Sequence, residues 1–301
     1  MRIAFLILAH HQPAHLARLV RILNRDWARI FIHIDRKVDI ADFQRLAPED
    51  GNIRFLGEDQ RTKVSWGGFS QVAATLNLLG AALSSGEAFT RFCLLSGSDF
   101  PIKGMEHIRA ALDTEKEFIR VDRRIGALDA NLHCKNVRYF YFTDVPLLKR
   151  SRLSGLMPRR CYTKINLYHG AQWWSLTGDC VKYIMDFIRS NRDYVCFHRW
   201  TLVPDEIFFH SIVKQSPFAS NITHDFETAP SYSEYMSLNE HGCTYIDWNA
   251  KGVPLPKVLT LDDYDSLMDS RCLFARKFDE RRSSSLLERL EKKISAPTSS
   301  Y

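Results

Sequence analysis

The chain of 301 residues has a formal net charge of +6, and 45% of its residues are hydrophobic. This composition excludes an intrinsically disordered chain and is sufficient for the core of one large domain or two tightly joined ones. The apolar start MRIAFLILAH leads directly into two histidines and a glutamine. It is too short to span a bilayer and has no small-residue cleavage site, so we interpret it as a buried strand.

Cysteine usage and charge indicate the cellular compartment and the kinds of binding partner. Seven cysteines are scattered without a CxxC pair, which argues against a disulfide framework and a zinc site and favours a reducing cytoplasm. Residues 120–164 hold eleven Lys or Arg and three Asp. A surface of this kind attracts a diphosphate, an acidic glycan or a membrane headgroup, although an ordinary solvated loop is the alternative. No nucleic-acid-binding motif accompanies the charge, so we expect no nucleic-acid partner.

The first half alternates short apolar segments with helical patterns. Strands are expected at 3–8, 30–34, 53–56 and 92–95, and helices at 13–23 and 69–83. This alternation predicts an α/β fold with a largely parallel sheet. The turn at 96–101 follows a buried strand, and ligands of such sheets bind beyond the carboxyl ends of strands. Neither GxGxxG after the first strand nor GxxxxGK[ST] occurs, so dinucleotide-binding and P-loop functions lose their main support.

The second half is less regular. Residues 118–168 predict a strand and then a long loop, before a strand at 170–176. A helix is expected to begin near Thr177, whose side chain can cap it, and another at Pro204. Beyond Phe278 the chain becomes polar, with a short amphipathic helix at 285–294 and a frayed end.

Four short clusters are more specific than the composition predicts. They are KVSWGGFS at 63–70, LSGSDFPI at 95–102, PDEIFFH at 204–210 and LFARKF at 273–278. In this order, and with 170–176 before the third, they closely resemble the family of the Core-2 and I-branching N-acetylglucosaminyltransferases and peptide O-xylosyltransferases, glycosyltransferase family 14. The resemblance covers residues 3 to 278, and the chain is identified as a bacterial member.

The resemblance implies a GT-A type fold, with a Rossmann-like nucleotide-binding sheet flanked by helices. One domain would span residues 1–280. Its nucleotide-sugar half would be 1–115 and its acceptor and catalytic half 116–280, with a polar tail at 281–301. The implied activity is inverting transfer of N-acetylglucosamine, xylose or glucuronate from a UDP-sugar to an acceptor hydroxyl, without a metal or other cofactor.

The family's catalytic base corresponds to Glu206. A carboxylate there would remove the proton of the attacking hydroxyl, and a position at a helix start would keep it ionised. The alternative is that Asp205 and Glu206 only complement the helix dipole, which is all that we expect of Asp205. Without a metal, fixed cations must face the departing diphosphate. Arg276 and Lys277 are the candidates, with Lys257 as a third.

The remaining donor-site residues have competing structural explanations. Asp35 is expected at the uracil, or in a turn, and His10 in the same pocket, or as a structural histidine. Trp66 would wall the donor or pack in the core, while Gly67 and Gly68 let backbone approach the donor. Asp99 stands where a metal-binding acidic pair could have been, but one carboxylate is a poor cation site. The expected UDP-sugar set is therefore His10, Asp35, Trp66, Gly67, Gly68, Asp99, Lys257, Arg276 and Lys277.

Acceptor binding is assigned to Gln172, Trp173 and Trp174. A strand would place the two tryptophans on opposite faces, so at most one would meet the sugar. The acceptor is expected to be a carbohydrate or a lipid-linked glycan in bacterial surface-glycan synthesis. The enzyme would act in the cytoplasm, with residues 120–164 touching the inner face of an anionic membrane. Two alternatives stay open: an inactive sugar-nucleotide or glycan-binding protein of this fold, and a metal-dependent transferase.

Overall fold

The computed structural model describes residues 1–126, 132–149, 151, 153–227 and 238–295. Its strands are β1 (Ile3–Ala9), β2 (Ala28–Ile34), β3 (Ile53–Phe55), β4 (Arg91–Ser96), β5 (Phe100–Pro101), β6 (Glu117–Arg124), β7 (Tyr168–Gly170), β8 (Ser175–Thr177), β9 (Ile222–Asp225), β10 (Glu240–His241), β11 (Thr244–Ile246) and β12 (Phe274–Arg276). Its helices are α1 (Pro13–Leu23), α2 (Ala41–Leu46), α3 (Phe69–Leu83), α4 (Met105–Leu112), α5 (Leu132–Arg138), α6 (Pro146–Lys149), α7 (Gly178–Ser190), α8 (Arg192–His198), α9 (Phe208–Lys214), α11 (Tyr264–Asp269) and α12 (Ser284–Ser295), with 3-10 turns η1 (Pro204–Glu206), η2 (Ala219–Asn221) and η3 (Leu261–Asp263).

The main sheet has the order β3-β2-β1-β4-β8-β6-β7, and β9 pairs with β6. Strands β3, β2, β1 and β4 run parallel, whereas β8 is antiparallel to both of its neighbours. Parallel strands are normally covered on both faces, which explains why β1 is almost continuously apolar and buried. The predicted α/β class is confirmed, with the Rossmann-like sheet that the GT-A resemblance implied.

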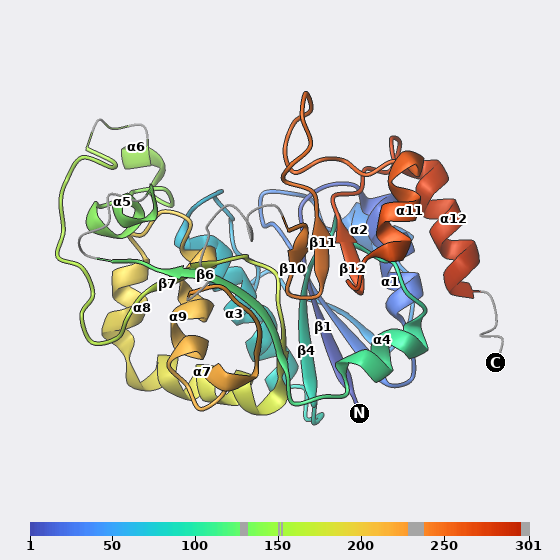
Figure 1. Cartoon of the computed structure of the whole chain (residues 1–301), viewed down its shortest axis with the longest axis horizontal. Coiled ribbons are helices and arrows are strands. Elements are labelled where there is room, and N and C mark those ends of the chain that lie inside the picture. Colours follow the sequence, from blue (N-terminus) through green and yellow to red (C-terminus); the bar gives the residue numbers. More distant parts are fainter. Residues whose placement is uncertain (127–131, 150, 152, 228–237, 296–301) are drawn as a thin grey trace.

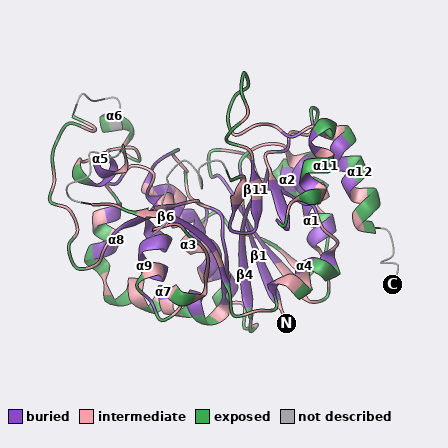
Figure 2. Ribbon diagram, viewed as in Figure 1, coloured by how far each residue is buried: buried purple, intermediate pink, exposed green. Residues whose placement is uncertain are grey.

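Helices cover both faces of this sheet (Figure 1). Alternate side chains of β1 divide between two cores, because successive residues of a strand point to opposite faces. Ile3, Phe5 and Ile7 join the core that contains α1, α4 and α12, whereas Ala4 and Leu6 join the core that contains α3, α7 and α9. Buried residues accordingly concentrate along β1 and β4 (Figure 2). The helices expected at 13–23 and 69–83 have these bounds in the structure.

A smaller sheet has the order β10-β11-β12-β5, so that three strands from the C-terminal part of the chain lie beside β5 from its first half. Strand β12 pairs with β5 in the register Phe274↔Pro101 and Ala275↔Phe100. Arg276 is the last residue of β12 and therefore lies beside the turn at 96–101. Residues far apart in the sequence thus meet at the edge predicted to bind ligand.

The segment expected to be a polar tail contains α12, which packs on the main core. Leu286, Leu287 and Leu290 are buried there, as the predicted amphipathic pattern requires. Arg18 of α1 donates through Nε and Nη2 to the two carboxylate oxygens of Glu291, at 2.8 and 2.9 Å. Among the described residues, no helix combines the length and the hydropathy needed to cross a membrane.

Two expected elements differ in the structure. Residues 170–176 are not one strand: β7 ends at Gly170 on β6, and β8 begins at Ser175 between β4 and β6. At Gly170 a Cβ would overlap a backbone carbonyl oxygen of β6, so this position has no room for a side chain. The helix expected from Pro204 is the 3-10 turn η1, and α9 begins only at Phe208. The non-helical backbone of Ile207, with φ −128°, separates the two.

Candidate functional site

Glu206 ends the η1 turn, and its carboxylate contacts one histidine. Glu206 Oε2 lies 3.1 Å from His169 Nε2, and the Glu206 side chain is 37% exposed. On the other side of the ring, His169 Nδ1 lies 3.3 Å from Asp122 Oδ2. Asp122 Oδ1 in turn accepts a 2.7 Å bond from Arg120 Nε. The predicted base is therefore partly open to solvent and is held from behind by a buried chain of charges.

These contacts shift both inner groups toward their charged forms. Burial by itself would lower the pKa of His169, but the carboxylates of Asp122 and Glu206 raise it to about 9. Burial would likewise raise the pKa of Asp122, yet His169 and Arg120 lower it to about 2. At neutral pH His169 is therefore an imidazolium and Asp122 a carboxylate.

The WGG turn is bonded to the turn that carries Glu206. Val203 has φ +46°, which is costly for a β-branched residue and is typical of functional sites. Its N–H donates to Gly67 O at 3.0 Å, and the Gly67 N–H donates to Gln71 Oε1 at 2.5 Å. Gly67 has φ +72°, a conformation that favours glycine. Trp66 is 78% exposed, so the alternative of a core tryptophan is wrong.

At Gly68 the close approach is to protein. A Cβ on Gly68 would overlap the Asp144 carboxylate, which accepts bonds from Ser70 N at 2.8 Å and Ser70 Oγ at 2.6 Å. Asp144 thereby satisfies free donors at the start of α3. The absence of a side chain at Gly68 serves this contact, which the sequence prediction of a donor approach did not foresee.

Asp205 has a different role from the surface charge that we expected. It is 6% exposed, and its Oδ2 accepts a 3.1 Å bond from Gln71 Nε2. Burial, and then the neighbouring Glu206 carboxylate, raise its pKa. Two adjacent acids therefore experience opposite environments, with Glu206 facing solvent and Asp205 facing the core.

Arg276 is fixed at the opposite end of the site. Its Nη1 lies 3.1 Å from Asp99 Oδ1, and its guanidinium lies 4.6 Å from the centre of the Trp173 ring. Asp99 is fully buried, and its Oδ2 accepts a 2.8 Å bond from Ser96 N. Burial raises the pKa of Asp99 to about 6, although Arg276 opposes the shift. Asp99, predicted to bind the donor, is covered by protein and instead orients Arg276.

Electrostatic interactions connect His10 with Asp35 on one side and with Lys277 and Arg276 on the other. Burial lowers the pKa of Lys277, and the adjacent guanidinium lowers it further. Burial also lowers the pKa of His10, whose charged neighbours are Asp35, Lys277, Lys37 and Arg276. Asp35 Oδ1 accepts bonds from the N–H of Lys37 at 2.9 Å and that of Val64 at 3.3 Å, so its turn-forming role is observed.

Lys257 lies close to Lys277 but is already paired. Its Nζ is 2.5 Å from Asp263 Oδ1, and its carbonyl accepts the Lys277 N–H at 3.4 Å. Its charge is therefore partly neutralised within the protein. Of the three predicted cations, Arg276 and Lys257 each have a buried carboxylate as counter-ion, Asp99 and Asp263 respectively.

The acceptor residues were predicted on a strand that does not exist as such. Trp174 is 1% exposed and packs on Phe209 with ring centroids 5.5 Å apart, so it cannot stack on a sugar. Trp173 is also buried, and the Arg276 guanidinium covers its ring. Gln172 is partly exposed. The assignment of both tryptophans to acceptor binding therefore does not agree with their burial.

The short segment 169–173 joins the two ends of the site. It begins at His169, against Glu206, and ends at Trp173, beneath Arg276. Four residue steps span at most roughly 14 Å, so the Cα atoms of His169 and Trp173 lie no farther apart than this. His169 and Asp122 were not predicted as site residues. His169 directly precedes the 170–176 motif and Asp122 alternates with Arg120 on one face of a strand, but neither pattern indicates that the two side chains meet.

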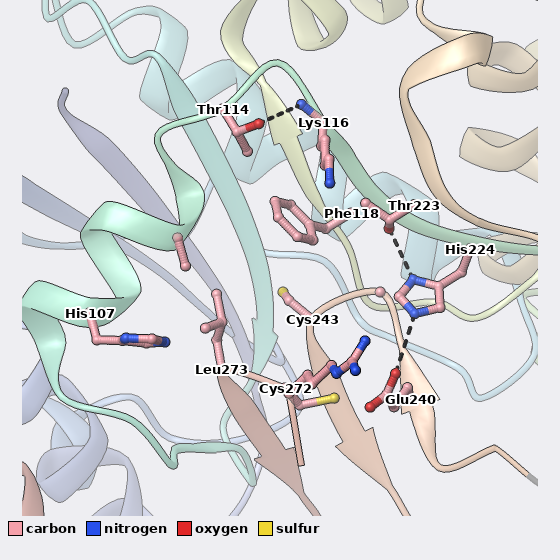
Figure 3. Close-up of a pocket in the computed structure, with 13 residues that line it drawn as sticks. His107, Thr114, Lys116, Phe118, Thr223, His224, Glu240, Cys243, Cys272 and Leu273 are labelled. Carbon is pink, nitrogen blue, oxygen red and sulfur yellow. Dashed lines mark hydrogen bonds and ion pairs between the residues drawn. The ribbon is translucent and has the colours of Figure 1, made fainter. Parts of the chain in front are cut away.

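A separate cavity of about 360 Å³ lies elsewhere, between α4, the start of β6, β9 and the small sheet (Figure 3). His224 is central to its wall, with Nδ1 2.9 Å from Thr223 Oγ1 and Nε2 3.7 Å from Glu240 Oε2. None of its thirteen lining residues is a predicted site residue. Within the described ranges, no group of three or more His, Cys, Asp and Glu side chains is placed to hold a metal ion.

Comparison with known proteins gives one family. A family model described as Core-2/I-Branching enzyme matches residues 3–266. Xylosyltransferase 2 of the dog (Canis lupus familiaris) is 25% identical over 306 residues, covering 97% of this chain and 33% of that protein. Beta-glucuronosyltransferase GlcAT14B of Arabidopsis thaliana is 24% identical over 318 residues, covering 97% of this chain and 66% of that protein.

The chain thus spans about a third of the length of the xylosyltransferase that it matches. Among solved structures, the galactosyltransferase LgtC in complex with donor and acceptor sugar analogs aligns with a TM-score of 0.40 at 9% identity. That alignment covers 100% of this chain and 98% of LgtC.

Proposed function

The chain belongs to the Core-2/I-Branching enzyme family, and on this basis we propose that it is an inverting glycosyltransferase that uses a UDP-sugar and needs no metal. The observation that supports this most directly concerns segment 169–173. A partly exposed carboxylate, Glu206, contacts its first residue, and a fixed cation, Arg276, contacts its last. A transfer between an alcohol and a sugar diphosphate requires a base on one side of the anomeric carbon and positive charge on the other.

In the proposed reaction Glu206 takes the proton of the acceptor hydroxyl. The acceptor oxygen forms a bond to the anomeric carbon as the bond between that carbon and the β-phosphate oxygen breaks, and UDP leaves with the electron pair. Within the described part of the chain, His169 is the one side chain that binds the Glu206 carboxylate. The other carboxylate oxygen is therefore the one proposed to receive the proton.

Arg276 and Lys277 are proposed to stabilise the charge that develops on UDP. Asp99 and Trp173 hold the Arg276 guanidinium before any substrate arrives, which avoids reorganisation during the reaction. Burial lowers the pKa of Lys277, which indicates that its ammonium lies in a desolvated place where a phosphate would pair with it strongly. We propose that these two cations replace a divalent ion.

At the nucleotide end, Asp35 and His10 are proposed to face the uracil. Asp35 Oδ1 accepts two backbone hydrogen bonds. The other carboxylate oxygen, Oδ2, lies 3.4 Å from Lys37 Nζ. Oδ2 is thus the Asp35 atom for an imide N–H. Xylose, glucuronate and N-acetylglucosamine remain the three proposed sugars, and the names of the relatives favour the first two.

We also propose that the enzyme acts on a bacterial surface glycan at the cytoplasmic face of a membrane. Leu147, Leu153 and Leu156 are 92%, 52% and 68% exposed within the basic segment 120–164. Exposed apolar residues next to basic ones suit an anionic lipid surface. In a flotation assay at low salt, the protein should float with vesicles that contain phosphatidylglycerol. Equal flotation with neutral vesicles would contradict this role.

The deciding experiment is a panel of UDP-sugars with excess EDTA. Thermal shift and UDP release should select one donor, and both signals should persist in EDTA. Binding without release or transfer, with any acceptor tested, would favour a sugar-nucleotide-binding protein. Activity that EDTA abolishes and a divalent ion restores would favour the metal-dependent alternative.

A further inference from the structure

His169 occupies a position between two carboxylates that links the proposed base to the interior of the protein. Its two ring nitrogens lie 3.1 Å from Glu206 Oε2 and 3.3 Å from Asp122 Oδ2. The His133 ring stacks on it with centroids 3.6 Å apart, and the His169 side chain is only 12% exposed. The ring therefore has little freedom to rotate away from either acid.

The inner half of this chain is anchored in the sheet. Arg120, which is fully buried, binds Asp122 and also donates to the carbonyls of Leu238 and Glu240, at 3.2 and 3.0 Å. Asp122 and His169 lie on paired strands, since β6 and β7 are antiparallel neighbours. Sites on strands are held more precisely than sites on loops.

We propose that His169 is a positioning residue for Glu206, and that its doubly protonated ring holds Glu206 and Asp122 at the same time. This role rests on the proposed function, because it concerns the base of the transfer reaction. The imidazolium would bind one oxygen of Glu206 and direct its other oxygen at the acceptor.

The contacts on both sides of the ring favour its protonated form, although only Nε2 has hydrogen-bond geometry and the Nδ1 contact with Asp122 is an ion pair. An imidazolium has two N–H donors, whereas a neutral imidazole has one donor and one acceptor. A neutral ring would therefore place a lone pair against one of the two carboxylates. The pKa of about 9 agrees with this, since the two acids outweigh the effect of burial.

Other ionisable groups also face His169. They are His133 on α5, His210 on α9 and Asp205 on η1, and Arg123 on β6 is the register partner of His169. Burial lowers the pKa of His133 to about 4 and that of His210 to about 4, so both are neutral when His169 is charged. Of these three histidines, His169 is thus the one that carries a positive charge.

The test compares two amides that imitate the two ends of the ring. His169→Gln can place an N–H near the position of Nε2, against Glu206, whereas His169→Asn reaches only the position of Nδ1, near Asp122. We expect His169→Asn to lower kcat by about 100-fold, the size of effect known for a base displaced by an ångström, with KM for the UDP-sugar unchanged. His169→Gln should retain several-fold more activity.

The pH profile separates positioning from a general loss of structure. The kcat of the wild type should fall as the pH rises through about 9. His169→Gln should have a lower kcat throughout and should not show this decline. A wild-type kcat in His169→Asn, or the same alkaline decline in both amide variants, would overturn the proposal.

An NMR titration of the imidazole needs no turnover and no variant of His169. The His169 ring should titrate near pH 9 in the wild type and at a lower pH in Glu206→Gln, because one of its two acids is then neutral. A midpoint near 6.5 in both proteins would overturn the proposal. A ring that titrates near pH 9 in a protein without transferase activity would refute the proposed function alone.

Discussion

The charge on His169 should make the stability of the fold depend on pH in a window where few side chains titrate. The perturbation is His169→Gln, and the quantity is the free energy of unfolding. In the folded protein the pKa of His169 is raised from 6.5 to about 9. Because the folded value is the higher one, the stabilisation is fully present below pH 6.5 and is lost as the pH rises through 9.

The size follows from the two values. A rise from 6.5 to about 9 corresponds to about 3 kcal/mol, since one pKa unit is about 1.4 kcal/mol. For a chain of this length that is roughly 5 °C in Tm. The quantity to compare is the free energy of unfolding of the wild type minus that of His169→Gln. This difference should be about 3 kcal/mol larger at pH 6.5 than at pH 9.5.

Urea unfolding at pH 6.5, 7.5, 8.5 and 9.5 measures this difference. Asp205, whose pKa burial raises, could ionise in the same window, so the pair should be repeated in the Asp205→Asn background. His107→Gln, at an exposed position of α4, is the matched control and should leave the pH dependence unchanged. Parallel curves for wild type and His169→Gln in both backgrounds would refute the reasoning.

Three further substitutions test the other parts of the site. Glu206→Gln should bind UDP as the wild type does and lose at least about 100-fold in turnover, so a near-normal rate would place the base elsewhere. Lys277→Ala should weaken the binding of UDP, measured by calorimetry, by about 10-fold or more and leave the binding of uridine unchanged. Lys257→Ala should have a smaller effect, because Lys257 is already paired with Asp263. If Lys277→Ala weakened UDP and uridine equally, Lys277 would not contact the diphosphate. Gly170→Ala should cost about 3 kcal/mol in urea unfolding, because its methyl group would overlap a backbone carbonyl, while Gly80→Ala meets open space and should not destabilise; equal stabilities would contradict the close approach.

Periodicity was sufficient for the elements that pack in regular layers. The helices at 13–23 and 69–83 and the strands around 3–8 and 92–95 each have one dominant apolar pattern, and tertiary packing follows it. Residues 170–176 are also apolar, but here the pattern misled. Two different neighbours, β6 and β4, each bind part of the segment, and no local signal marks the change.

The site divides in the same way. Arg276, Lys277 and Glu206 belong to short motifs and could be predicted from the sequence. Asp122 and His169 could not, because their contact depends on the register of β6 against β7, which a single sequence does not reveal. Asp99 was found, but its burial behind Arg276 was not, since whether a carboxylate faces a ligand or another side chain is decided by packing.

Both ends of the site use a buried acid to hold a cation whose other side faces the proposed reaction. Asp99 holds Arg276 at the leaving-group end, and Asp122 holds His169 behind the base. Fixed charges of this kind stabilise a transition state without reorganisation. The two cations differ in one respect: a guanidinium cannot lose its proton in a folded protein, whereas an imidazolium can. The guanidinium at the proposed leaving-group end therefore keeps its charge at every pH at which the protein is folded, whereas the imidazolium behind the proposed base loses its charge as the pH rises through about 9.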